Sequence, residues 1–204
     1  MISLECGGFD EGPTLKAMFR ARKEVFVDLL KWDVPVLAGE YEIDQFDDEH
    51  AWYVIVTDDN GNHLASARLL ETGRPHILGS LFPQLCAGGV PSGRDVLEIT
   101  RFCLDRHQNA GSRRTARNRL VSALVAVALE RGVRSYTGVA DLGWLQQILA
   151  FGWDCRPLGI PQEIGGRQLG ALEISITEQT PALLAGNGIW APEPFAPGRL
   201  AQAA

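Results

Sequence analysis

The chain has few cysteines and no long apolar run, and both absences narrow the class of protein. Only four cysteines occur among the 204 residues, and none has the CxxC or Cys/His spacing of a zinc site. We therefore expect reduced thiols and no metal. No uninterrupted apolar stretch approaches the ~18 residues of a membrane helix. The first twelve residues also lack the basic and apolar segments of a signal peptide, so we predict a cytoplasmic protein without membrane association.

Positive charge is also scarce relative to negative charge. The formal net charge is -6 at pH 7, which argues against nucleic acid as a partner. Hydrophobic residues make up 46% and charged residues 22%, which are ordinary values for a globular protein. The length fits one domain. We predict a single domain over residues 1–185 and a loosely ordered tail, rich in Pro, Gly and Ala, over 186–204.

Negative charge is concentrated in one stretch, Glu40 to Glu49, which reads EYEIDQFDDE and holds six carboxylates. Like charges at this density repel each other, and alone they indicate a solvated segment. Ordered elements are expected on both sides, however: a turn over 32–35 and an apolar strand over 52–57. We therefore interpret the stretch as an ordered, cation-binding loop, with Asp44 and Asp47 as its principal carboxylates.

Two arginines lie where apolar residues are expected. Residues 13–30 predict an amphipathic helix with an inward apolar stripe that runs from Leu15 to Leu29, and Arg22 falls on that stripe. Residues 63–70 predict the second strand of a hairpin, in which Arg68 shares a face with leucines. A guanidinium does not lose its charge, so a buried one needs an anion. For Arg22, a side chain that reaches out to water is the alternative.

The strand predicted over 95–104, DVLEITRFCL, carries a charge on each face. Glu98 lies beside Thr100 and Phe102, whereas Arg101 lies on the opposite face. A half-solvated strand needs polar residues on one face only. The pattern therefore indicates a central strand next to a site, with a bulge that redirects one residue. A purely structural Glu/Arg salt bridge is the alternative.

The second half of the chain alternates helices and strands. We predict a helix over 115–131, a strand over 134–140, a helix from Asp141 to Gly152 and a strand over 171–177. The third of these is expected to turn four side chains inward, namely Leu142, Leu145, Ile148 and Leu149. A short helical turn is expected near residues 78–85. Helices interleaved with a mainly antiparallel sheet predict a mixed α/β sandwich.

Four arginines crowd the start of the helix predicted over 115–131. They are Arg113, Arg114, Arg117 and Arg119. Cations are disfavoured at a helix N-terminus, so helix physics does not explain the cluster. An acidic partner or a phosphate group explains it, and a solvated basic face is the alternative.

Six short motifs occur in order along the chain: ARKEVF, LKWDVP, EIDQFD, ARLL, LFP and LEITRF. Together they resemble the acyl-homoserine-lactone synthases of bacterial quorum sensing, over about residues 12–155. The fixed positions of that family fall on Arg22, Phe26, Trp32, Asp44, Asp47, Arg68, Phe82, Glu98 and Arg101. The resemblance implies a fold like that of the Gcn5-related N-acetyltransferases, a three-layer α/β (α+β) sandwich with helices on both faces of a mixed, mainly antiparallel sheet.

The resemblance also implies a two-substrate reaction. The acyl group of an acyl-carrier-protein thioester passes to the amine of S-adenosyl-L-methionine, and lactonisation then expels methylthioadenosine. S-adenosyl-L-methionine is thus a co-substrate, and no tightly bound cofactor is expected. Glu98 is implied as the base that deprotonates the amine through a water molecule.

Further site residues follow from the same resemblance. Asp44 and Asp47 suit the sulfonium and ammonium groups of S-adenosyl-L-methionine. Its carboxylate is expected to bind Arg22, Arg68 or Arg101. Phe26 and Trp32 are expected to wall the pocket. Alternatively, the acids and arginines pair with each other and only order the N-terminal lobe.

The acyl chain is expected between the sheet and the later helices in this family. The residues expected to line it are Thr100, Phe102, Thr137, Val139, Trp144, Leu145 and Leu149. Phe82 is expected to bind substrate without assignment to either substrate. The arginines at 113, 114 and 117 suit docking of an acidic carrier protein, and acyl-CoA suits the same charges.

Two other functions are considered. An ordinary N-acyltransferase of this fold, using acyl-CoA on another amine, needs a glycine-rich pyrophosphate loop, but the corresponding segment, RRTARNR, has no glycine. A non-catalytic binder of S-adenosyl-L-methionine has no need of Glu98. The sequence leaves open the acyl chain length, its 3-substitution, the donor and the oligomeric state.

Overall fold

The structure is a computed structural model that describes residues 1–8 and 12–196, and it divides into two compact units. Of the described residues, unit 1 comprises 1–8, 12–69, 101–123 and 191–196, and unit 2 comprises 70–100 and 124–190. Within the described ranges, no helix is long and apolar enough to cross a bilayer.

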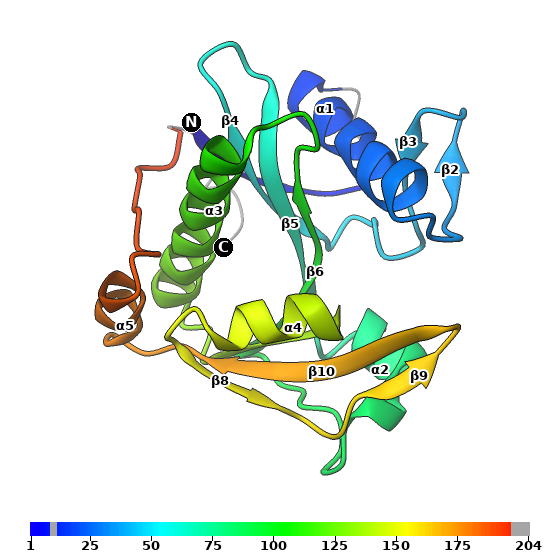
Figure 1. Cartoon of the computed structure of the whole chain (residues 1–204), viewed down its shortest axis with the longest axis vertical. Coiled ribbons are helices and arrows are strands. Elements are labelled where there is room, and N and C mark those ends of the chain that lie inside the picture. The colour runs from blue at the N-terminus through cyan, green and yellow to red at the C-terminus, as the bar shows by residue number, and fades with distance from the viewer. Residues whose placement is uncertain (9–11, 197–204) are drawn as a thin grey trace. The chain divides into compact units, whose positions relative to one another are not determined.

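Unit 1 holds strands and helices from the first third of the chain (Figure 1). They are β1 (Ile2–Cys6), α1 (Pro13–Arg22), the π-helix η1 (Lys23–Leu29), β2 (Val36–Leu37), β3 (Tyr41–Glu42), β4 (Trp52–Thr57) and most of β5 (His63–Glu71). The end of β6 (Val96–Leu104) and the first part of α3 (Ala110–Arg131) complete it. The strand order is β1-β4-β5-β6, and α1 and the first part of α3 lie on opposite sides of β4 and β5.

Unit 2 holds the remaining elements. They are α2 (Ile77–Leu81), the 3₁₀ turn η2 (Pro83–Leu85), β7 (Ser135–Asp141), α4 (Leu142–Leu149), β8 (Asp154–Pro157), β9 (Gln162–Ile164), β10 (Arg167–Ser175) and α5 (Thr180–Gly186). The order is β6-β7-β10-β8, with β9 also paired to β10. Only β6 and β7 run parallel among the pairs whose register is described, from Val96 opposite Ser135 to Glu98 opposite Thr137.

Helices cover both faces of the strands in unit 2. Ala171 of β10 packs against Leu78 of α2. The neighbouring residue, Gly170, lies against Leu145 of α4, so close that a methyl group there would come within 2.7 Å of the leucine side chain. Since adjacent residues of a strand point to opposite faces, α2 and α4 lie on opposite sides of β10. The predicted mixed, mainly antiparallel sheet with helices on both faces is confirmed.

The helix predicted over 13–30 is interrupted. α1 ends at Arg22, and the next seven residues form the π-helix η1. A π-helix has more residues per turn than an α-helix, so the apolar stripe changes phase. Leu29, which was predicted to face inward, is therefore 47% exposed.

Other boundaries also differ from the predictions. α3 begins at Ala110 because the Asn109 side chain accepts a hydrogen bond from the Ser112 amide, an N-terminal cap that the sequence reading missed. β10 spans Arg167–Ser175 rather than 171–177. Leu142 and Leu149 of α4 were predicted to face inward, but they are 37% and 36% exposed. The strands β1, β2, β3, β8 and β9 and the helix α5 were not predicted.

The segment after α5 returns to unit 1 and is bound there. The Ala191 amide donates to Ser122 Oγ at 2.8 Å, and Glu193 forms an ion pair with Arg119 at 2.7 Å. The Ala196 amide donates to the Ile2 carbonyl at 2.8 Å. Residues 197–204, the end of the tail predicted to be loosely ordered, lie outside the described residues.

Candidate active site

Three arginines and three carboxylates of unit 1 form a closed ring of ion pairs. The arginines come from α1, β5 and β6, and the acids come from β3 and the loop after it. Each arginine binds two acids, and each acid binds two arginines. The order around the ring is Arg22, Asp47, Arg68, Asp44, Arg101 and Glu42, which closes on Arg22. The N–O distances of these pairs lie between 2.6 and 2.9 Å.

Three of the pairs are bidentate, including that of Arg101 with Glu42, to whose two oxygens Nε and Nη2 donate at 3.2 and 2.9 Å. Both Nη atoms of Arg22 donate to Asp47 at 2.8 Å, and those of Arg68 donate to Asp44 at 2.6 and 3.1 Å. Parallel N–H···O bonds of this kind fix orientation as well as distance. The ring is almost completely covered, and only the side chains of Asp44 and Arg101, each 9% exposed, reach the surface.

Arginine partners favour the charged forms of two acids of the ring, Asp44 and Asp47. Burial on its own would raise the pKa of the Asp47 carboxyl, but Arg22 and Arg68 hold that pKa well below its usual range. Burial opposes the same change at Asp44, where hydrogen bonds from Arg68 lower the pKa. Burial and the charge of Asp47 raise the pKa of Tyr53, whose hydroxyl donates to Asp47 Oδ1 at 3.0 Å. Three positive and three negative charges leave the ring neutral.

Backbone amides hold the acidic loop in shape. Asp47 Oδ2 accepts from the Asp44 amide and Asp44 Oδ1 accepts from the Phe46 amide, both at 2.9 Å. Such contacts of aspartate with nearby amides are typical of tight turns. The stretch from Glu40 to Glu49 is therefore ordered despite its many carboxylates. Each acid of the ring also contacts two guanidinium groups, which offset the repulsion between like charges.

Arg101 has an unusual backbone. Its φ angle is +49°, a left-handed conformation that is rare for a residue with a side chain and rarer inside a strand. The register of β6 with β7 ends at Glu98, three residues earlier. The irregularity fulfils the prediction that this strand redirects one residue. It aims the Arg101 guanidinium at Glu42 and Asp44.

Two aromatic side chains flank Arg101 within unit 1. Phe26 of η1 stacks on Trp32, with ring centroids 4.7 Å apart. The Arg101 guanidinium lies 5.6 Å from the Phe26 ring and 5.7 Å from the Trp32 ring. These distances suit cation–π attraction. Unit 1 therefore brings together the aromatic and charged residues that were predicted to bind S-adenosyl-L-methionine.

Glu98 lies in unit 2 and is fully buried. Its Oε1 accepts a hydrogen bond from the Leu78 amide, in the first turn of α2, at 2.9 Å. Thr137, also fully buried, stands opposite Glu98 in the register of β6 and β7. Paired residues of neighbouring strands point to the same face, so the threonine side chain is next to the carboxylate.

Apolar side chains of unit 2 cluster with Leu78, whose backbone amide binds this carboxylate. The buried residues Leu78, Leu85 and Ala171 form a cluster, and Phe82, Cys86 and Val139 are partly buried against it. Burial, together with the negative charge of Glu98, raises the pKa of the Cys86 thiol. The fully buried carboxylate of Glu98 is thus bound to a residue of an apolar cluster whose outer members, such as Phe82, are only partly buried. Such an apolar setting suits a proton acceptor.

The other residues predicted to contact the acyl chain are spread over both units. Thr100 is buried in unit 2, and Phe102 is partly buried in unit 1. On α4, Trp144 packs edge-on against Phe151, and Leu145 lies on the face of β10 opposite to Leu78.

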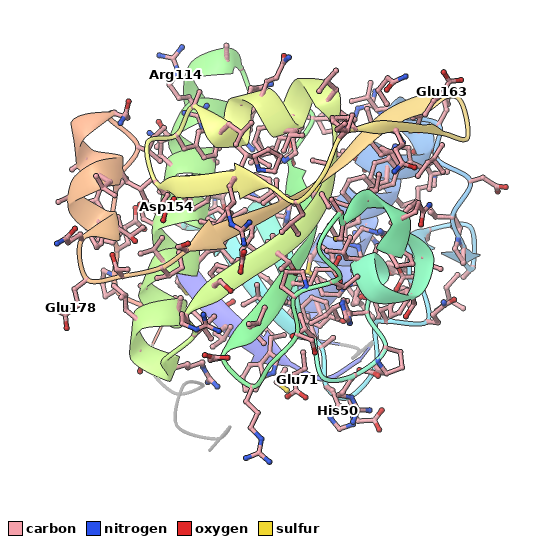
Figure 2. All side chains as sticks on the ribbon, turned by 90° about the horizontal axis from the view of Figure 1, so that it is seen from below. His50, Glu71, Arg114, Asp154, Glu163 and Glu178 are labelled. Atoms are coloured by element: carbon pink, nitrogen blue, oxygen red, sulfur yellow. The ribbon has the colours of Figure 1, made fainter. Side chains whose placement is uncertain are left out.

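The predicted arginine cluster lies on the first turns of α3. Arg114 is exposed and projects away from the helix (Figure 2), and Arg113 is half-buried. Arg117 donates to the Asn118 side chain at 2.8 Å, and burial and the neighbouring Arg114 lower its pKa. Arg119 is engaged by Glu193.

Sequence reasoning missed Glu42 and Tyr53. Glu42 is fully buried and binds both Arg22 and Arg101. Alternation along an extended chain places Glu42 on the same face as Asp44, which is the signal that could have found it. Tyr53 stands in an apolar strand, and nothing in its sequence context marks it as a partner of Asp47.

Comparison with known proteins gives consistent results. The family model described as autoinducer synthase matches residues 10–181. An acyl-homoserine-lactone synthase of Ralstonia nicotianae is 32% identical over 175 residues, which cover 82% of this chain and 85% of that protein. TofI, solved in a ternary complex with an inhibitor and MTA, is 30% identical with a TM-score of 0.76. The match covers 93% of this chain and 99% of the TofI chain.

Two further structures bear on donor and fold. MesI, a CoA-dependent acyl-homoserine lactone synthase, is 26% identical with a TM-score of 0.80, covering 97% of this chain and 100% of its own. An acyl-CoA N-acyltransferase from Pseudomonas aeruginosa is 14% identical with a TM-score of 0.58, covering 85% of this chain and 98% of its own. The second likeness concerns the fold alone, and it agrees with the fold predicted from the sequence.

Proposed function

The chain belongs to the autoinducer synthase family and is an acyltransferase, and from this premise we propose that it makes an N-acyl-L-homoserine lactone. The substrates are S-adenosyl-L-methionine and an acyl thioester, and the product is a quorum-sensing signal. The match to the family over residues 10–181 carries the proposal. The MTA bound to TofI is methylthioadenosine, the by-product expected of lactonisation.

The first step forms an amide. The substrate ammonium must lose a proton before its nitrogen attacks the thioester carbonyl, and we assign Glu98 as the acceptor of that proton through a water molecule. As the carbon–nitrogen bond forms, the carbon–sulfur bond of the thioester breaks. The second proton of the amine passes to the sulfur, which leaves as the thiol. The hydrogen bond from the Leu78 amide holds one carboxylate oxygen in place, which supports this role.

The second step closes the lactone. The carboxylate of the acylated intermediate attacks its own γ-carbon, and the carbon–sulfur bond of the sulfonium breaks. Methylthioadenosine leaves with the electron pair, so the positive charge disappears in the same step. No proton transfer is required, and the chain needs only to hold the carboxylate near the γ-carbon.

The ion-pair ring supports a narrower assignment of these residues than the resemblance implies. Asp47, Arg22 and Arg68 are covered and saturated by each other, so we assign them to ordering the N-terminal lobe. Asp44 and Arg101 retain some exposure and are the members proposed to contact S-adenosyl-L-methionine. The stacked pair of Phe26 and Trp32 is proposed to wall that site.

The acyl chain is assigned to the apolar surface of unit 2. Phe82 and Val139 are partly buried against the cluster of Leu78, and Thr137 lies beside Glu98. An acyl group next to the proposed base would place its thioester carbonyl where the amine is deprotonated. Chain length and 3-substitution are left to the assay below.

We favour an acyl-carrier protein as the donor. Arg113, Arg114 and Arg117 give the start of α3 a positive surface, and carrier proteins are acidic. MesI is CoA-dependent, so acyl-CoA is tested alongside.

Incubation of the protein with S-adenosyl-L-methionine and a panel of carrier-protein and CoA thioesters tests the function. Mass spectrometry is expected to find an N-acyl homoserine lactone and methylthioadenosine in equal amounts. Acylated amine without methylthioadenosine would instead indicate a plain N-acyltransferase. Tight binding of S-adenosyl-L-methionine with no product from any thioester would indicate a non-catalytic binder.

A further inference from the structure

The π-helix η1 carries one of the aromatic residues proposed to wall the S-adenosyl-L-methionine site. Its hydrogen bonding is that of a π-turn: the Leu30 amide donates to the Val25 carbonyl, five residues back, at 2.9 Å. The Trp32 amide then reaches back to the Phe26 carbonyl at 2.8 Å. π-turns inside helices are uncommon and frequently mark functional sites, so what maintains this one is informative.

An ion pair spans the π-turn. Lys23 Nζ lies 3.0 Å from Asp28 Oδ2, and both side chains are partly exposed. In an α-helix each residue turns by about 100°, so side chains five apart point about 140° away from each other. In a π-helix the fifth residue returns close to the same face. The ion pair therefore forms in the π geometry and is disfavoured in an α geometry.

The π-turn decides where Phe26 points. Within η1, Val25 and Phe26 are buried in a cluster with Ala21 and Cys103, and Trp32 packs against that cluster. An α-helical continuation would rotate the residues after Lys23 relative to α1 and separate Phe26 from Trp32. The Arg101 guanidinium would then lose the two rings that flank it.

We propose that Lys23 and Asp28 are positioning residues for S-adenosyl-L-methionine, which clamp η1 in its π-helical form and thereby hold Phe26 against Trp32 and Arg101. The inference rests on the proposed function, because it assumes that these three side chains form the binding surface. Neither clamp residue touches substrate. Their effect is on affinity for S-adenosyl-L-methionine, whereas the thioester and the chemical step are unaffected.

Four variants test the clamp: Lys23→Gln, Asp28→Asn, the charge-exchanged pair Lys23→Asp with Asp28→Lys, and Arg20→Gln. Calorimetric titration with S-adenosyl-L-methionine alone measures its Kd, without any thioester. Each single clamp variant is expected to raise Kd about two- to fivefold, the range of a partly exposed ion pair. The charge-exchanged pair restores the five-residue contact and is expected to return Kd to within about twofold of the original protein.

Arg20→Gln is the matched control. Arg20 lies on α1, which precedes η1, and is therefore outside the π-turn. It forms an ion pair with Glu40 and has no place in the proposed site. Its Kd is expected to equal that of the unaltered protein. An equal rise of Kd in the control would mean that any loosening of the lobe weakens binding. A Kd of the charge-exchanged pair as high as that of the single variants would show that the ion pair does not act as a clamp. Either result overturns the inference.

Near-ultraviolet circular dichroism separates this inference from the proposed function. The stacked rings of Phe26 and Trp32 contribute to the aromatic signal without any ligand. The single clamp variants are expected to reduce that contribution, and the charge-exchanged pair is expected to restore it. If the unaltered protein fails to bind S-adenosyl-L-methionine, the proposed function is wrong, and the dichroism still reports on the clamp. If it binds and the single variants match it in Kd and dichroism, the clamp alone is wrong.

Discussion

At the scale of single residues, the ring of ion pairs raises the question of how six charges are tolerated in a protein interior. A buried charge is costly unless it is paired and hydrogen-bonded. Each guanidinium here meets two carboxylates, so no member depends on one partner. Breaking such an arrangement costs more than forming it contributes, because removal of one group leaves buried charges without full compensation.

Asp47→Asn tests this argument. Asp47 binds Arg22 and Arg68 and accepts from Tyr53, so the neutral amide leaves two buried guanidinium groups short of charge. We expect the free energy of unfolding to fall by about 3–5 kcal/mol, measured by urea denaturation. Glu49→Gln is the control, since Glu49 belongs to the same acidic stretch but is exposed. A loss below about 1 kcal/mol for Asp47→Asn would mean that the ring is not a source of stability.

Glu98→Gln tests the proposed base. Glutamine keeps the oxygen that accepts from the Leu78 amide, so the fold and the Kd for S-adenosyl-L-methionine are expected to stay unchanged. Loss of the proton acceptor is expected to lower kcat by about 10²–10⁴-fold. The control is Glu163→Gln, an exposed glutamate on the β9–β10 hairpin (Figure 2), which should retain full activity. Unimpaired turnover in Glu98→Gln would transfer the role of base to another group.

At the scale of elements, helices and strands with a regular apolar pattern could be predicted, whereas the change from α-helix to π-helix could not. The strands β4 and β6 agree with their predicted ranges to within a residue, because β-branched residues and alternation mark them. η1 was missed because its apolar spacing also fits an α-helix. The exposure of Leu29 and the five-residue hydrogen bond from Leu30 to Val25 reveal the π-helix in the structure. β8 and β9 are short and polar, and pairing with β10 rather than local preference makes them strands.

The α3 helix carries the prediction about the acyl donor. Charge reversal of Arg113, Arg114 and Arg117 to glutamate places negative charge where an acidic carrier protein is proposed to dock. We expect KM for the acyl-carrier protein to rise by about tenfold or more, with a smaller effect at high salt. Circular dichroism should confirm that α3 remains folded.

The control for this experiment is Arg94→Glu, an exposed arginine in unit 2. It makes one such charge reversal at a residue that does not belong to α3, and it should leave KM for the carrier protein unaltered. An unchanged KM in the triple variant would place carrier docking elsewhere on the molecule.

At the scale of the whole molecule, the fold class and most of the proposed site residues could be predicted from the sequence. Charged residues on apolar faces, such as Arg22, Arg68 and Glu98, stand out because burial of charge requires a partner. The identity of the partners could not be predicted. Which acid meets which arginine depends on the path of the loop after β3 and on the left-handed backbone of Arg101, and neither leaves a local signal.

The stability of the chain is expected to fall in two separate pH windows. Burial lowers the pKa of His63 to about 4, against about 6.5 for the unfolded residue. The unfolded chain therefore takes up a proton first as pH falls. This contribution is complete above pH 6.5 and is lost toward pH 4, by about 3 kcal/mol. The depressed pKa of Asp47 acts below that range, so the stability from the ring persists to about pH 4 and is lost beneath it.

Urea unfolding at several pH values between 7 and 4 measures the first window. His63→Gln, which keeps a polar group near Ser66 Oγ, is expected to flatten the decline between pH 6.5 and 4. A decline as steep in His63→Gln as in the unaltered protein would assign the first window to other groups.

The closed ring also constrains how this sequence can drift over generations. In a chain of ion pairs, a terminal pair can be lost or exchanged without disturbing the others, which offers a route for gradual change. A ring has no terminal member. A single replacement at any of its six positions leaves both neighbours without one partner, and these two neighbours carry the same charge as each other. A compensating change in one neighbour leaves the other neighbour unmatched. Descendants of this protein are therefore expected to keep all six residues or to have replaced the whole ring.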